Sequence, residues 1–145
     1  MHYSKILVPL DGSDPAVLAA KHATHIAAKF GAEVTFLYVC PVFNFINEFS
    51  IHATIDYIQI KEELTTQGNN ILDFSLKEIS LENIPSQRKL CWGYPAEEII
   101  KEAKAGEYDL IVTGSRGLSM VKGYLMGSVS NRVTKHAPCP VLVVR

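Results

Sequence analysis

Short, unbroken runs of β-branched and aromatic residues alternate along this chain with helical patterns, and this alternation restricts the fold more than any other feature. Apolar runs without polar alternation are typical of β-strands that are covered on both faces. The four apolar runs span residues 6–8, 34–39, 110–113 and 141–144. A fifth segment, residues 88–92, is more polar and predicts an edge strand.

The segments between these runs have the spacing and the end signals of helices. Ser13-Asp14-Pro15 combines a capping residue with proline at the first helical position, alanines follow at intervals of three and four, and Gly31 predicts the end. Further helices are predicted from about residue 56 to 79, over Pro95–Ala105, and from residues 127–128 to near 136. Residues 41–55 show no clear period and are expected to form a mobile or partly helical insertion.

Strands that alternate with helices pair in parallel through right-handed crossover connections. The sequence therefore predicts an α/β fold with a doubly wound parallel sheet. No internal repeat, linker or low-complexity stretch divides residues 1–145, so a single domain is expected.

Composition excludes several classes of protein. Hydrophobic residues make up 48% of the 145 residues, which argues against disorder, and 14 Lys and Arg against 15 Asp and Glu leave no basic excess for nucleic acid. No apolar run reaches a membrane-spanning length, and the amino terminus lacks the shape of a signal peptide. Three widely spaced cysteines indicate neither a disulfide framework nor a zinc site. We expect a cytoplasmic protein with no nucleic-acid or membrane partner.

The most unusual stretch is a glycine-rich loop after the fourth run. Gly114 and Gly117 are three residues apart, nine residues follow, and Gly127-Ser128 then opens a helix. Free backbone N–H groups in such a loop, with a helix N-terminus behind them, suit the binding of phosphate. The alternative is an ordinary turn and helix cap. Neither a Walker A pattern nor G-x-G-x-x-G after the first strand is present, which excludes the common NTPase and dinucleotide motifs.

Three landmarks together resemble the universal stress protein family. These are residues 5–13 (KILVPLDGS), the G-x-x-G-(nine residues)-G-[ST] loop and residues 138–144 (PCPVLVV). The resemblance covers nearly the whole chain and implies a Rossmann-like, five-stranded parallel sheet in the order 3-2-1-4-5 with helices on both faces. The complete glycine pattern is similar to that of the ATP-binding subgroup.

The resemblance also implies a set of nucleotide contacts. Asp11 would accept a hydrogen bond from ribose or adenine, although an Asp in Asp-Gly-Ser is also a common turn residue. The matching positions are Pro9, Leu10 and Asp11 beside adenine and ribose; Val39, whose main chain meets the adenine edge; Gly114, Ser115, Arg116 and Gly117 in the first half of the phosphate loop; and Gly127, Ser128, Val129 and Ser130 in the second half.

The leading functional hypothesis is an ATP-binding stress-response protein that acts as a nucleotide-dependent switch toward an unknown protein partner. ATP would order the loop from Gly114 to Ser128 and the 41–55 insertion, and Mg²⁺ or Mn²⁺ would be held through the phosphates. AMP or a cyclic nucleotide stays open as the ligand. One alternative is slow ATP hydrolysis or autophosphorylation near Arg116, Lys122 and Ser128, although no general base is evident. Another is a nucleotide-free interaction module.

Other features receive simpler interpretations. In the family's strand order, residues 141–144 form an apolar edge strand, which implies a homodimer through antiparallel contacts of this strand. His22 and His25 lack a third metal ligand and are expected on an exposed helix surface. Cys40 is expected as an apolar filler beside the adenine pocket.

Overall fold

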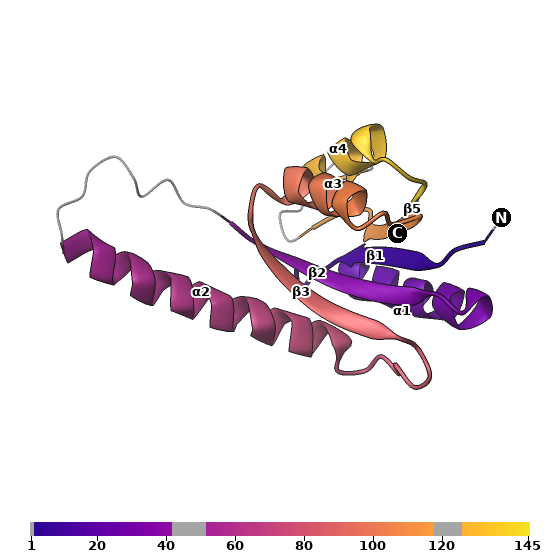
Figure 1. Ribbon diagram of the computed structural model, residues 1–145, viewed down its shortest axis with the longest axis horizontal. Coiled ribbons are helices and arrows are strands. Elements are labelled where there is room, and N and C mark those ends of the chain that lie inside the picture. The colour runs from indigo at the N-terminus through magenta and orange to yellow at the C-terminus, as the bar shows by residue number, and fades with distance from the viewer. Residues whose placement is uncertain (1, 42–51, 118–125) are drawn as a thin grey trace.

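A computed structural model describes residues 2–41, 52–117 and 126–145, with side chains from residue 57 onward in the second range. The described chain forms one parallel sheet in the order β3-β2-β1-β4-β5, which confirms the predicted fold and strand order (Figure 1). In chain order the elements are β1 (Lys5–Pro9), α1 (Asp14–Phe30), β2 (Glu33–Pro41), α2 (His52–Leu76), β3 (Ser86–Gly93), α3 (Pro95–Ala105), β4 (Leu110–Gly114), α4 (Ser128–His136) and β5 (Val141–Val144).

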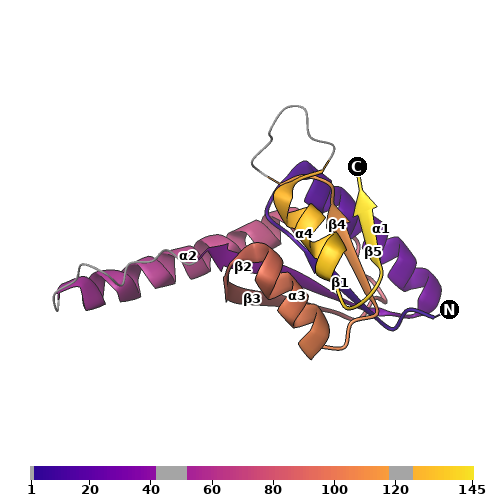
Figure 2. The same cartoon turned by 90° about the horizontal axis from the view of Figure 1, so that it is seen from above.

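Two hydrophobic layers cover the two faces of the sheet. Ile6 and Val8 of β1 face one layer together with α1 and α2, whereas Leu7 faces the other layer with α3 and α4. Figures 1 and 2 show these helix pairs on opposite sides of the strands. Because both faces are buried, apolar residues predominate on both faces of the central strands, which is why their sequences do not alternate regularly with polar residues.

Helix α1 shows how local signals and packing agree. Ser13 caps its N-terminus by accepting a hydrogen bond from the Ala16 N–H, and Gly31 ends it in the left-handed conformation, as predicted. The helix presents small side chains to the sheet, which lets its backbone approach closely. The buried alanines of this face are Ala16, Ala19, Ala20, Ala23 and Ala27.

The outer elements differ from the sequence prediction in their ends. Strand β2 continues to Pro41, past the end of β1, because the longer β3 pairs with it as far as Pro41 opposite Gly93. Helix α2 begins at His52 and ends at Leu76 instead of spanning about 56–79. At its end the Ile79 N–H donates to the Leu76 carbonyl, a tight turn that still places Ile79 against the core. The expected insertion, residues 41–55, therefore contains the last residue of β2 and the beginning of α2, and residues 42–51 lie outside the described residues.

A glycine inside α2 has a packing reason. A Cβ atom at Gly68 would lie 2.7 Å from Leu90 Cδ1 and 2.7 Å from Tyr38 Cδ1, closer than carbon atoms tolerate. Glycine therefore lets the α2 backbone rest directly on β2 and β3 despite its low helix propensity.

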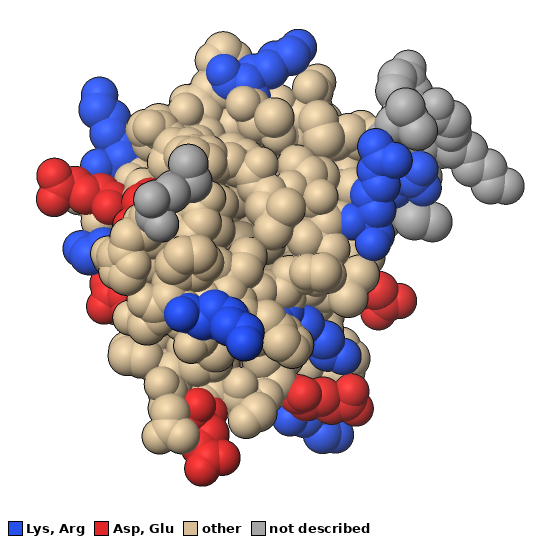
Figure 3. All heavy atoms as spheres, turned by 90° about the vertical axis from the view of Figure 1, so that its right-hand side faces the viewer, with Lys and Arg blue, Asp and Glu red and all other residues tan. Residues whose placement is uncertain are grey.

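Charged side chains are dispersed on the face seen in Figure 3. Lys and Arg alternate with Asp and Glu around a large uncharged area, so this face carries no continuous basic surface. In the described part of the chain, no helix is both long and apolar enough to cross a membrane.

Candidate functional site

The winding of the sheet reverses between β1 and β4, which are paired through Ile6 opposite Leu110 and Leu7 opposite Ile111. In open α/β sheets, ligands bind beyond the carboxyl ends of the strands at such a point. The loop that follows β1 and the glycine-rich loop that follows β4 therefore leave the same edge of the sheet side by side, in agreement with the strand order that the resemblance implied.

A cavity of about 320 Å³ opens at this edge. Eleven of the twelve predicted site residues line it; Ser115, the twelfth, does not. The predicted residues on its wall are Pro9, Leu10, Asp11, Val39, Gly114, Arg116, Gly117, Gly127, Ser128, Val129 and Ser130. The structure thus brings together residues that are far apart in the sequence.

Ser115 is instead part of the frame that supports the loop. Its N–H donates to the Val144 carbonyl at 2.7 Å, and its carbonyl accepts from the Gly127 N–H at 2.7 Å. The buried Ser130 hydroxyl donates to the Gly114 carbonyl at 2.6 Å. These bonds hold the two described halves of the glycine-rich loop together at its base. Residues 118–125, which include Lys122, lie outside the described residues.

The glycines of the loop have different steric reasons. A Cβ at Gly114 would lie 2.7 Å from the Pro15 carbonyl carbon, so glycine is needed there for α1 to pack on β4. At Gly117 it would lie 2.7 Å from Asp11 Oδ2. At Gly127, however, φ is −70° and the nearest atom to a Cβ would be Arg116 Cα at 3.5 Å, an ordinary contact. The packing of the described residues therefore does not explain Gly127.

The N-termini of α1, α3 and α4 all reach the cavity, through Ala16, Pro95 and Ser128. In α1, the Ser13 side chain caps one of the unpaired N–H groups. In α3, the carboxylates of Glu97 and Glu98 in the first turn offset the positive end of the helix dipole. Helix α4 has no side-chain cap from the described residues and no acidic residue in its first turn. Its N-terminus is thus the one best suited to an anion.

Asp11 forms the side-chain hydrogen bonds expected of a turn residue and also lines the cavity. Its Oδ1 accepts hydrogen bonds from the Ser13 N–H at 3.0 Å and from the Ser13 hydroxyl at 2.5 Å. This arrangement fixes the carboxylate at the mouth of the loop that follows β1. The same Ser13 hydroxyl oxygen caps α1, so the carboxylate and the helix start are positioned together.

Sequence reasoning missed six residues of the cavity wall. Leu37, Val39 and Ile99 form an apolar side that continues into the core beneath α3. Burial, with Cys40 and Asp11 nearby, raises the pKa of the Tyr38 phenol. No sequence motif identifies these residues, because three of them lie within strands and three within helices, outside the loops that the glycine pattern and the resemblance mark. The six are Ala16, Leu37, Tyr38, Pro95, Ile99 and Thr113.

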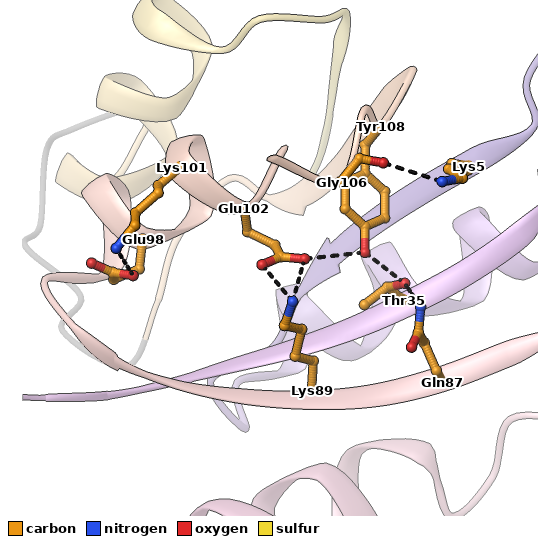
Figure 4. Close-up of polar contacts among 9 residues, drawn as sticks. All are labelled: Lys5, Thr35, Gln87, Lys89, Glu98, Lys101, Glu102, Gly106 and Tyr108. Atoms are coloured by element: carbon orange, nitrogen blue, oxygen red, sulfur yellow. Dashed lines mark hydrogen bonds and ion pairs between the residues drawn. The ribbon is translucent and has the colours of Figure 1, made fainter. Parts of the chain in front are cut away.

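A polar network holds α3 on the sheet and so positions its cavity-facing end (Figure 4). Lys89 Nζ donates to Glu102 Oε1 at 2.8 Å, and the buried Tyr108 hydroxyl forms hydrogen bonds with Thr35 Oγ1 (2.9 Å) and Glu102 Oε1 (3.3 Å). Gln87 Nε2 donates to the same Thr35 oxygen at 3.1 Å. The hydrogen bond to Glu102 raises the pKa of Lys89, and burial raises that of Tyr108.

Two minor interpretations can now be compared with the structure. His22 and His25 lie on the exposed side of α1, and the described residues contain no cluster of three or more His, Cys, Asp or Glu side chains that could hold a metal ion. Cys40 is fully buried, but its thiol points away from the cavity toward α2, with Sγ 3.8 Å from the Leu64 carbonyl. It fills the core beneath α2 instead of the expected pocket.

Comparisons with known proteins agree with this architecture. The model of the universal stress protein family matches residues 2–145. A universal stress protein of Methanocaldococcus jannaschii is 39% identical over 99% of this chain and 82% of its own length, and one of Bacillus subtilis is 34% identical over 99% of each. The solved structure of UspA from Lactobacillus plantarum is 27% identical, with a TM-score of 0.83 over 100% of this chain and 99% of that one. The chain therefore belongs to the universal stress protein family.

Proposed function

We propose that this protein binds an adenine nucleotide, ATP in particular, in the cavity at the reversal point of the sheet. The observation that carries the proposal is the N-terminus of α4, which opens into this cavity without a side-chain cap from the described residues. Its backbone N–H groups, together with Gly127 and Arg116, would bind the phosphates. The apolar side formed by Leu37, Val39 and Ile99 would take the base.

Other members of this fold support the choice of ligand class. One solved universal stress protein structure is a complex with cAMP, and one from Arabidopsis thaliana has AMP bound. At 23% and 20% identity they share the fold with this chain, with TM-scores of 0.62 and 0.66. The choice of ATP rests on the complete glycine pattern, which resembles the ATP-binding subgroup. Any accompanying Mg²⁺ or Mn²⁺ would depend mainly on phosphate oxygens, since the described residues offer no metal-binding cluster.

The proposal concerns binding and its consequences, not turnover. Asp11 is the sole carboxylate among the described residues that line the cavity, and its Oδ1 already accepts two hydrogen bonds from Ser13. We propose that bound nucleotide changes the surface offered to a protein partner in the stress response. Limited proteolysis with and without ATP tests this step: protection of cleavage sites by ATP supports the switch, and identical fragments and rates contradict it.

A single added methyl group tests the binding site. Gly127→Ala meets no steric conflict with the described residues and, as an N-cap change, lowers the free energy of unfolding by about 1 kcal/mol or less. The methyl group would nevertheless stand between the α4 amides and a phosphate. Loss of one hydrogen bond to a charged group weakens binding by roughly 10- to 100-fold. Isothermal titration calorimetry with ATP measures this change.

Gly114→Ala provides the contrasting variant. Its Cβ would press on the backbone of Pro15, so we expect a loss of about 1–3 kcal/mol in the free energy of unfolding. Thermal unfolding of both variants separates the two roles. Absence of ATP binding by the unmodified protein, or unchanged affinity in a folded Gly127→Ala variant, would contradict the proposed site.

A further inference from the structure

We infer that Thr113 is a specificity-determining residue of the proposed nucleotide site: its hydroxyl group recognises a hydroxyl group of the nucleotide's ribose. The inference rests on the proposed function and adds to it a residue that distinguishes ribonucleotides from deoxyribonucleotides. Neither the glycine pattern nor the resemblance to the family pointed to this position.

Thr113 has a buried hydroxyl group at the cavity wall. The residue is 6% exposed and lines the cavity from β4. Within the described residues its hydroxyl donates only to the carbonyl of the adjacent Gly114, at 3.3 Å. That separation is long for an O–H···O bond, whose usual range is about 2.5–3.0 Å. The same carbonyl already accepts the Ser130 hydroxyl at 2.6 Å, so the Thr113 proton can turn to a ligand without leaving the carbonyl unpaired.

The position of Thr113 matches that of a sugar between base and phosphates. The apolar wall at Leu37 and Val39 belongs to β2, β1 lies next in the sheet, and Thr113 is on the following strand, β4. Ser130 in the first turn of α4 shares the Gly114 carbonyl with Thr113, so Thr113 lies beside the proposed phosphate end. A nucleotide that spans from the β2 wall to α4 would pass its ribose over β1 and β4.

The chemistry of the wall also favours this role. Leu37, Val39 and Ile99 cannot form side-chain hydrogen bonds, so a polar ligand atom placed against them would lose its bonds to water. A threonine hydroxyl both donates and accepts, as does a ribose hydroxyl, and the two can satisfy each other inside the cavity. A ligand lacking that hydroxyl would leave Thr113 with only its long bond to Gly114. Sites built to bond a hydroxyl discriminate against its absence.

The test compares Thr113→Val with Thr113→Ser. Valine keeps the branched shape and removes the hydroxyl, whereas serine keeps the hydroxyl. Affinities for ATP, 2′-deoxy-ATP and 3′-deoxy-ATP are measured by calorimetry on each folded protein, with thermal unfolding as the control for stability. We expect the unmodified protein to prefer ATP over one deoxynucleotide by about 5- to 10-fold, the effect of one neutral hydrogen bond. Thr113→Val should abolish that preference, and Thr113→Ser should retain it.

The outcomes of this test distinguish a failure of the Thr113 inference from a failure of the proposed nucleotide binding. If the unmodified protein binds ATP but shows no preference over either deoxynucleotide, or if Thr113→Val keeps the preference unchanged, the role of Thr113 is overturned and nucleotide binding stands. If the unmodified protein binds none of the three nucleotides, the proposed function fails and this inference fails with it.

Discussion

At the scale of single residues, identical residue types serve unrelated purposes in this protein. Gly114 is required by the backbone of α1, whereas Gly127 has room for a side chain and stands at the proposed phosphate site. Ser115 and Ser130 were both predicted as ligand contacts, yet the first supports the loop through its backbone and the second bonds a carbonyl of that loop. A motif thus contains framework and contact positions together, and only their surroundings separate them.

Cys91 provides a prediction on pH dependence. Burial on β3, with the carboxylates of Glu98 and Glu102 nearby, raises its pKa from 9.0 to about 11. The unfolded chain therefore releases this proton near pH 9, before the folded protein does. The stability contributed by the neutral thiol is complete below pH 9 and is lost as the pH rises toward 11. Because the Cys91 side chain is only partly buried, solvent screening reduces this loss to about 1–2 kcal/mol, less than the full 1.36 kcal/mol per pKa unit.

Replacing the thiol should remove this part of the alkaline destabilisation. Cys91→Ser does not titrate in this range, so its free energy of unfolding should fall less between pH 8 and pH 11 than that of the unmodified protein. Urea unfolding at several pH values measures both slopes, each relative to its own value at pH 7. Parallel curves for the two proteins would show that Cys91 does not contribute.

At the scale of elements, local signals predicted α1 and α3 because a capping residue, proline or glycine marks the ends of these helices in the sequence. They predicted α2 but not its bounds. Its interior Gly68 lowers the helix propensity, and the structure explains this glycine by the close contact with Tyr38 and Leu90. The site shows the same division. The loops after β1 and β4 were visible as motifs, whereas Thr113 was hidden because it lies inside β4, one residue before the glycine-rich loop begins, where no motif marks it.

The close packing of α2 predicts that Gly68→Ala destabilises the fold. Alanine favours a helix by about 1 kcal/mol over glycine, but the added methyl would overlap Tyr38 and Leu90, and overpacking typically costs about 1–3 kcal/mol. We expect a net loss in the free energy of unfolding. The exposed neighbour Asn69 is the control, since Asn69→Ala raises helix propensity without a clash. In thermal unfolding, Asn69→Ala should have a higher midpoint temperature than the unmodified protein, and Gly68→Ala a lower one.

At the scale of the whole molecule, near-neutral charge and a proposed anion site are compatible. The face in Figure 3 mixes both signs of charge, and the chain has 14 Lys and Arg against 15 Asp and Glu. Backbone N–H groups at the start of α4 supply positive potential without a positive net charge. The proposed anion site therefore depends on the position of α4 relative to the sheet. Helix α3 packs against α4 and is held on the sheet by the hydrogen bonds of Glu102.

The edge of the sheet carries the last prediction, a homodimer formed by β5. This strand pairs with β4 on one side, and its sequence VLVV is apolar. Leu142 is 37% exposed, and an apolar edge strand favours association with another chain. We propose that two copies pair β5 in antiparallel fashion around a two-fold axis, because an isologous contact requires the same strand from both subunits.

Leu142→Asp tests this arrangement, because it would place like charges close together across the axis and bury them without partners. Sedimentation velocity at micromolar concentration should show a particle of twice 16.1 kDa for the unmodified protein and a shift toward 16.1 kDa for the variant. Phe74→Asp is the control, since Phe74 is 71% exposed on α2, which packs beside β2 and β3 at the other end of the strand order. If both variants dissociate equally, or if the unmodified protein sediments as a monomer, β5 is not the dimer interface.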